Sequence, residues 1–470
     1  MHRTMVLDVV GLTPELVGEH TPALAALAKA GAMRPLSTVL PAVTCSVQST
    51  FTTGRFPGLP PAGHPDLAPS GHGCVGNGWY FRELAEIGFW KQSNHLVGGD
   101  KIWDDAHRRD PSFTCAKLFW WFNMYSTADF TVTPRPMYPA DGRKLPDIYT
   151  QPPELRASLQ ETLGQFPLFD FWGPRAGITS SRWITASAVD VWRRQNPTLA
   201  LVYLPHLDYD LQRQGPRGPG IPAALREVDA LCGDLIEIAK ADNARVIVLS
   251  EYGITAVNGA VHINRILRDA KLLTIRTEQG RELLDAGASR AFAVADHQVA
   301  HVYIRDTPVA EVKALLEKVP GIERVLDAEG KRAAGLDHPR SGELVAISAA
   351  DKWFTYYYWT DDDRAPDFAR TVDIHRKPGY DPVELFLDPK LLAPKATVGW
   401  KLARRAMGFR VLLDVIPLDP SLVKGSHGRL TDSPEQGPLV ISSEPLPEGP
   451  IAATAIKQLV LDHVFRDGFN

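Results

Sequence analysis

Residues 199–208 have the sequence LALVYLPHLD, in which the apolar run Leu199–Leu204 is followed by a proline and then by polar side chains. Two further short runs, Met5–Leu7 and Arg245–Leu249, end in polar residues in the same way. Such runs are typical of buried strands, and the amphipathic stretch Ile221–Lys240 is typical of a helix between two of them. The alternation predicts an α/β fold with a mostly parallel central sheet and helices on both faces.

In an open parallel sheet, ligands bind at the carboxyl ends of the strands. Polar residues that directly follow the predicted strands are therefore the first candidates for a functional site. These residues are Asp8, His206, Asp208, Glu251 and Tyr252.

The chain has 470 residues, of which 44% are hydrophobic and 23% are charged, enough apolar material for one large core. We expect a single domain over 1–470. Proline, glycine and aromatic residues dominate about 78–180 and 350–417. We expect these two stretches to be cap insertions, whose aromatic side chains either pack in the core or stack against a ligand.

The 51 basic and 55 acidic residues give a net charge of −4, without the basic excess that binding along a nucleic-acid backbone requires. We therefore expect no polymeric nucleic acid as a partner. The sequence shows no secretory leader and no apolar run of membrane-spanning length, so we expect no membrane association. The four cysteines are scattered without a CxxC pair, which favours a cytoplasmic protein. The oligomeric state stays open.

The segment 41–54, PAVTCSVQSTFTTG, places Thr44 at the start of a predicted helix. Unpaired backbone N–H groups and the helix dipole stabilise an anion at such a position. Thr44 is therefore either the N-cap of this helix or a nucleophile, and the segment alone leaves both open.

Further motifs follow in order: a TTGxxP turn, and then HGxxxN at His72–Asn77. Together with the strand-end Asp8 and the Pro-x-x-Thr before the helix, they resemble the nucleotide pyrophosphatase/phosphodiesterase branch of the alkaline phosphatase superfamily. The resemblance implies that Thr44 is the nucleophile and forms a phospho-threonine. It also implies that Asn77 donates to a non-bridging phosphoryl oxygen.

The resemblance extends to YLPHLDYDLQRQGP at 203–216, IVLSEYG at 247–253 and GSHG at 425–428. In the family, three Asp and three His at such places hold two divalent ions, usually zinc. Here Gln212 and Tyr252 stand at two of the His positions, and Glu251 stands at one of the Asp positions. The implied ligands are Asp8, Thr44, Asp208, Gln212, Glu251 and His427.

Because amide and carboxylate oxygens suit harder ions than imidazole does, this ligand set favours manganese or magnesium over zinc. His297 and His375 are the candidates to replace the missing histidines. Each of these two residues has a second interpretation as a hydrogen-bonded structural histidine.

We therefore expect a metal-dependent hydrolase that acts on a small phosphoric ester, as a phosphodiesterase or nucleotide pyrophosphatase. Two alternatives stay open: a phosphomonoesterase on the same site, and a catalytically degraded binding protein of the same fold. A serine hydrolase and a nucleotide-binding protein of the phosphate-loop class find no support, because the chain has no GxSxG and no GxxxxGK[ST] motif.

Overall fold

The computed structural model describes residues 1–468 of the chain except 65–66, 141, 392, 408 and 410. Its main feature is a nine-stranded sheet. Across the sheet the strands are β21 (Ile451–Ala452), β2 (Ala32–Ser37), β20 (Leu439–Ser442), β9 (Arg245–Leu249), β1 (Thr4–Val9), β8 (Leu199–Leu204), β5 (Cys115–Leu118), β6 (Phe130–Pro134) and β7 (Ile148–Gln151).

The centre of this sheet is parallel, and antiparallel pairs occur toward its edges. β1 pairs in parallel with β8 and β9, and β5 pairs in parallel with β8 and β6. β20 and β7 run antiparallel to their neighbours β9 and β6. β1, β8 and β9 are buried along their whole length, which explains why their sequences are continuous apolar runs.

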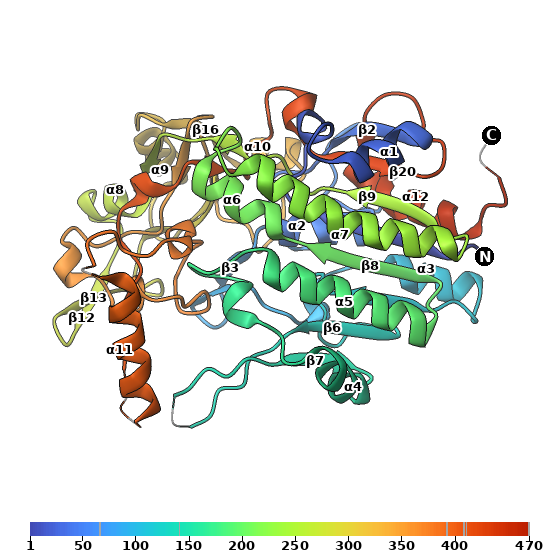
Figure 1. The fold of residues 1–470 in the computed structure, drawn as a ribbon. Coiled ribbons are helices and arrows are strands. Elements are labelled where there is room, and N and C mark those ends of the chain that lie inside the picture. Colours follow the sequence, from blue (N-terminus) through green and yellow to red (C-terminus); the bar gives the residue numbers. More distant parts are fainter. Residues whose placement is uncertain (65–66, 141, 392, 408, 410, 469–470) are drawn as a thin grey trace.

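Helices cover both faces of the central sheet (Figure 1). One face carries α1 (Pro22–Ala30), α5 (Ile178–Gln195), α6 (His206–Gln214) and α7 (Ile221–Ala241). The other face carries α2 (Thr44–Thr53), α3 (Ile102–Arg109) and α12 (Ile456–Phe465), while α4 (Glu154–Leu163) packs beside β7. The predicted fold class is confirmed.

A second, four-stranded antiparallel sheet lies beyond the carboxyl ends of the central strands. It consists of β14 (Ala291–Asp296), β15 (Val299–Ile304), β17 (Leu344–Ser348) and β16 (Ile322–Leu326). Three helices accompany it: α8 (Ile263–Asp269), α9 (Val309–Leu316) and α10 (Ala328–Ala333). The sheet has a hydrophobic core of its own, separate from the core of the central sheet.

The remaining strands form short two-stranded pairs. They are β3 (Gly78–Phe81) with β4 (Glu86–Phe89), β10 (Thr255–Ala256) with β19 (Gly425–Ser426), β11 (Gly259–Val261) with β18 (Lys352–Phe354), and β12 (Ile275–Glu278) with β13 (Arg281–Leu284).

The two expected cap insertions differ in the structure. Residues 115–151 lie within the first expected cap, yet they supply three strands, β5, β6 and β7, to the central sheet. These strands have only four or five residues each and stand among prolines and aromatics, which hides their period in the sequence. The second stretch is largely irregular where it is described, apart from β18, short 3-10 helices and α11 (Pro394–Ala406). The division into one domain with two caps stays a prediction.

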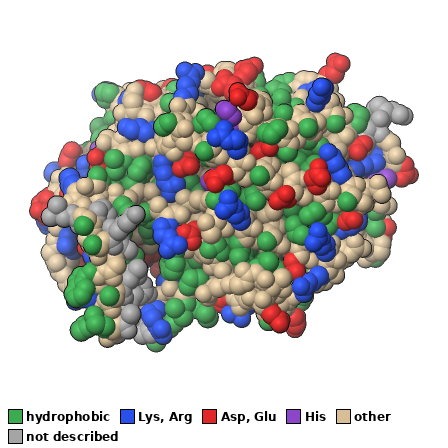
Figure 2. All heavy atoms as spheres, in the orientation of Figure 1, with side chains coloured by type: hydrophobic (Ala, Val, Ile, Leu, Met, Phe, Trp, Pro, Cys, Tyr) green, Lys and Arg blue, Asp and Glu red, His purple; other side chains and the backbone are tan. Residues whose placement is uncertain are grey.

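The surface over α5, α6 and α7 carries Lys and Arg interspersed with Asp and Glu (Figure 2), as the balanced composition leads one to expect. Of the helices that the structure describes, none combines the length and the apolar character needed to cross a lipid bilayer.

Candidate active site

Polar residues from four elements meet at the carboxyl ends of the central strands. Asp8 lies near the end of β1, opposite Tyr203 of β8 and Leu249 of β9, and Glu251 follows β9 by two residues. Thr44 begins α2, and Asp208 lies in the first turn of α6. Asp8 and Glu251 are fully buried, and Thr44 is 3% exposed. The sheet topology therefore gathers residues that are far apart in the sequence.

Thr44 is the first helical residue of α2, and the N-cap is Val43. The N-cap interpretation of Thr44 is therefore wrong. Its Oγ1 lies 3.2 Å from the hydroxyl of Tyr252, and that hydroxyl donates to Oδ1 of Asp208 at 3.2 Å. A hydrogen-bonded chain thus leads from the Thr44 hydroxyl to a buried carboxyl group.

Gln48 lies four residues after Thr44, on the same face of α2. Its Nε2 donates to Oδ2 of Asp8 at 3.1 Å and to Oε1 of Glu251 at 2.7 Å. Its Oε1 accepts from the backbone N–H of Trp121 at 2.7 Å, which fixes the direction of the amide. The Gln48 amide therefore bridges the two carboxyl groups.

Gln212 lies four residues after Asp208, on the same face of α6. Its Nε2 donates to Oδ2 of Asp208 at 2.7 Å, and its Oε1 accepts from the hydroxyl of Tyr380 at 2.9 Å. Both carboxylate oxygens of Asp208 thus accept a hydrogen bond from within the protein, one from Gln212 and one from Tyr252.

Four rings stack beside these carboxyl groups, in the order Tyr252, His427, His297 and Tyr380. Their successive centroids are 3.5 Å, 3.7 Å and 3.6 Å apart. Nδ1 of His427 lies 2.8 Å from the carbonyl oxygen of Ala42, just before α2. Burial lowers the pKa of both His427 and His297 well below the usual range, so both imidazoles are neutral.

Asn77 is held beside the start of α2. Its Oδ1 accepts from the backbone N–H of Cys45 at 3.0 Å, and its Nδ2 donates to Oδ1 of Asp296 at 3.1 Å. Oδ2 of Asp296 accepts from the backbone N–H of Asn77 at 2.7 Å. The amide nitrogen keeps a second N–H, because only one of its two hydrogens is needed for Asp296.

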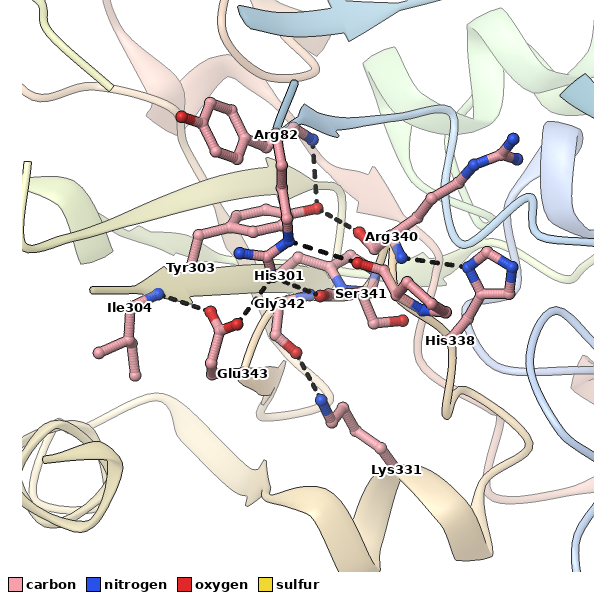
Figure 3. Close-up of polar contacts among 12 residues, drawn as sticks. Arg82, His301, Tyr303, Ile304, Lys331, His338, Arg340, Ser341, Gly342 and Glu343 are labelled. Carbon is pink, nitrogen blue, oxygen red and sulfur yellow. Dashed lines mark hydrogen bonds and ion pairs between the residues drawn. The ribbon is translucent and has the colours of Figure 1, made fainter. Parts of the chain in front are cut away.

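The second sheet braces the turn that carries Asn77. Nη1 of Arg340 donates to the Gly73 carbonyl at 2.9 Å, and Nε2 of His301 lies 2.8 Å from the Val75 carbonyl. Nδ1 of His301 accepts from the N–H of Gly342 at 3.2 Å, so its Nε2 carries the proton and donates. Figure 3 shows His301, Arg340 and Gly342. It also shows Lys331, whose Nζ donates to the Gly342 carbonyl at 2.7 Å.

The carboxyl groups of this site carry unusually high pKa values. Burial raises the pKa of Asp8 and of Asp208 to about 7, and it raises the pKa of Glu251 well above the usual value, with the neighbouring Asp8 adding to the effect. Oδ1 of Asp8 and Oε2 of Glu251 have no hydrogen-bond partner among the described residues.

His375 lies apart from this group. It is exposed, and its Nδ1 lies 3.3 Å from the carbonyl oxygen of Phe89. Of the residues predicted from the sequence, the structure brings together Asp8, Thr44, Asn77, Asp208, Gln212, Glu251, His297 and His427 but not His375. His206 points elsewhere as well, because 206–214 is a helix and its Nε2 lies 3.2 Å from Oε2 of Glu227. Trp79 and Trp120 are 2% and 1% exposed and pack in the core.

The donor set fits two divalent ions poorly. Both oxygens of Asp208 and the amide oxygen of Gln212 already have partners, and the Gln48 amide stands between Asp8 and Glu251. Within the described part of the chain, no three His, Cys, Asp or Glu side chains are arranged to hold a metal ion. Both oxygens of Asp208 and one oxygen each of Asp8 and Glu251 thus accept hydrogen bonds from side chains of the protein.

Three residues of this site escaped the sequence analysis: Gln48, Asp296 and Tyr380. The spacing of four residues from Thr44 could have identified Gln48, because it places both side chains on one helix face. No local signal links Asp296 to Asn77 or Tyr380 to Gln212, since each pair is more than 150 residues apart in the sequence.

Comparison with known proteins finds one matching family and several similar structures. Residues 4–381 match the model of the family described as type I phosphodiesterase / nucleotide pyrophosphatase. No curated protein matches the sequence. Phosphonoacetate hydrolase from Sinorhizobium meliloti 1021, solved with phosphonoformate, is similar in structure with a TM-score of 0.61 and 15% identity, over 98% of this chain and 96% of that chain.

Murine ectonucleotide pyrophosphatase / phosphodiesterase 5 is similar with a TM-score of 0.58 and 13% identity, over 100% of this chain and 96% of that chain. An inactive form of the murine protein was solved with AMP. At these identities the solved structures show a common fold. The resemblance predicted from the sequence motifs is confirmed by the family match.

Proposed function

Because the chain belongs to the type I phosphodiesterase / nucleotide pyrophosphatase family, whose members are hydrolases of phosphoric esters, we propose that it cleaves a small phosphoric diester or pyrophosphate at Thr44. The observation that carries this proposal is the hydrogen-bonded chain from Thr44 through Tyr252 to Asp208. A threonine hydroxyl is a weak nucleophile unless a neighbouring group accepts its proton, and this chain supplies an acceptor.

In the proposed step Oγ1 of Thr44 attacks phosphorus and the bond to the leaving alcohol or phosphate breaks in line. The Thr44 proton passes to the Tyr252 hydroxyl, while the Tyr252 proton passes to Oδ1 of ionised Asp208. The product of this step is a phospho-threonine, and attack by water on it restores the hydroxyl. No part of the step passes through a metal ion.

Two groups next to Thr44 would stabilise the charge on the phosphoryl oxygens. The first turn of α2 presents backbone N–H groups to an anion at its start. The second group is the remaining N–H of the Asn77 amide, which Cys45 and Asp296 hold in place from two sides. Because these donors are held in place before the reaction, they suit the charge that develops in the transition state.

The test compares Thr44→Ala and Thr44→Ser with the parent on bis(nitrophenyl) phosphate and on nitrophenyl phosphate. Thr44→Ala should lose turnover by several orders of magnitude, and Thr44→Ser should keep part of it. A diester rate above the monoester rate supports the diesterase over the phosphomonoesterase. Turnover of Thr44→Ala within tenfold of the parent would refute the assignment of the nucleophile.

The second candidate is a binding protein that holds a phosphorylated small molecule without turning it over. The observation that favours it is the saturation of Asp208 and of one oxygen each of Asp8 and Glu251 by internal hydrogen bonds. This candidate predicts binding of AMP or a diester by calorimetry with no product release, and Asn77→Ala would then weaken binding alone.

A further inference from the structure

The Gln48 amide takes up the position between Asp8 and Glu251 that a bridging cation needs. Trp121 fixes the amide oxygen, so both amide hydrogens face the two carboxyl groups, at 3.1 Å and 2.7 Å from nitrogen to oxygen. An amide nitrogen carries no lone pair that binds a metal ion, and it brings two hydrogen-bond donors. A divalent ion at this place would have to displace Gln48 from a fully buried setting, where Gln48 itself is 2% exposed.

Asp208 is closed to a cation in a similar way. Gln212 and Tyr252 donate to its two oxygens, and the amide oxygen of Gln212, the one atom of that side chain suited to a hard ion, accepts from Tyr380. The Tyr252 hydroxyl donates to Oδ1 of Asp208 at 3.2 Å and lies 3.2 Å from Oγ1 of Thr44, so in this arrangement it acts as a hydrogen-bond donor to the carboxylate.

We propose that this site works without divalent ions, because the Gln48 and Gln212 amides and the Tyr252 hydroxyl hold Asp8, Glu251 and Asp208 where two cations would otherwise hold them. The inference concerns the site of the proposed function and rests on it, but it is tested by metal binding rather than by turnover. Each of the three side chains is held by a second partner: Trp121 donates to Gln48, Tyr380 donates to Gln212, and Thr44 lies 3.2 Å from the Tyr252 hydroxyl. These contacts fix the donors in place, while one oxygen each of Asp8 and Glu251 has no partner among the described residues.

The experiment measures metal in the purified full-length chain, prepared without chelators, by elemental analysis. It then follows thermal unfolding with EDTA and with 1 mM zinc, manganese or magnesium. A site with a Kd of about 10 μM would add about 2.7 kcal/mol at that concentration. For a chain of this length the gain corresponds to a rise in Tm of about 3 °C. We expect less than about 0.1 ion per chain and no rise of that size.

A converted variant tests whether the named donors are responsible. It combines Gln48→Ala, Gln212→His, Glu251→Asp and Tyr252→His, which restores a carboxylate and imidazole set of the kind that zinc prefers. The converted variant should bind at least one zinc ion per chain. Zinc should raise its Tm, and EDTA should reverse that rise. Gln195→His, an exposed position at the end of α5, is the control and should bind none.

The outcomes separate this inference from the proposed function. Hydrolysis that EDTA leaves unchanged, in protein without metal, supports both. Metal-free protein with no turnover supports the inference and overturns the proposed hydrolysis. A stoichiometric ion in the parent protein, or a Tm raised by metal, overturns the inference while hydrolysis stands. A folded converted variant that binds no zinc overturns the role given to these side chains.

Discussion

Replacing Tyr252 by phenylalanine removes one oxygen atom from the middle of the chain that joins Thr44 to Asp208. The Tyr252 hydroxyl lies 3.2 Å from each of its two partners, and the ring stacks on His427 at 3.5 Å. Phenylalanine keeps that ring contact, so the change is confined to the hydroxyl. Oδ1 of Asp208 then loses the hydrogen bond from Tyr252 in a buried setting, where Asp208 is 7% exposed.

The expected loss of stability is about 1–3 kcal/mol, the usual cost of leaving a buried acceptor without its donor. For a chain of 470 residues this corresponds to a fall in Tm of about 1–3 °C. The expected loss of turnover is much larger, about 10²–10⁴-fold, because the proton acceptor of the nucleophile is gone.

The assay measures kcat on a nitrophenyl diester beside the Tm of the same preparation. Tyr380→Phe is the matched control, since it removes a hydroxyl of the same ring stack that contacts Gln212 instead of Thr44. The control should lose a similar amount of stability and less than tenfold in kcat. If folded Tyr252→Phe turns over within tenfold of the parent, the proton does not leave Thr44 by this route.

Three further predictions follow from the same geometry. Asn77→Ala should lower kcat by about 10²–10³ through loss of one fixed donor, and an unchanged kcat with normal circular dichroism would reduce the HGxxxN motif to a turn signal. Gln48→Met should lower the free energy of unfolding by about 1–3 kcal/mol in urea titrations, because two buried carboxyl groups lose their shared donor; equal stability would contradict the bridging role. Burial raises the pKa of Asp208 to about 7, so between about pH 4 and pH 7 the folded chain holds a proton that the unfolded chain releases, and this group lowers stability as the pH rises through that window. Asp208→Asn should therefore gain stability relative to the parent as the pH rises from about 4 to about 7, and a pH-independent difference would show that Asp208 titrates normally.

The sequence alone determined the fold class and the family. Short runs of three to six mostly apolar residues that end in polar residues predict buried parallel strands, because a strand covered on both faces needs apolar side chains on both. The order of the motifs around Asp8, Thr44, Asn77 and His427 identified the family, which the match over 4–381 confirms. The strands β5, β6 and β7 were hidden, since four or five residues are too few to show a period.

Only the tertiary structure decided what each polar residue does. Local sequence placed Asp8, Asp208 and Glu251 at strand ends, and these are the places where a metal site was predicted. Trp121 donates to the Gln48 amide oxygen and so fixes which way the amide points, and Asp208 accepts the hydrogen bond that the Tyr252 hydroxyl donates. Both partners come from other elements of the fold. The packing of distant elements determines hydrogen-bond partners of this kind, so they cannot be predicted from residue type and spacing along the chain.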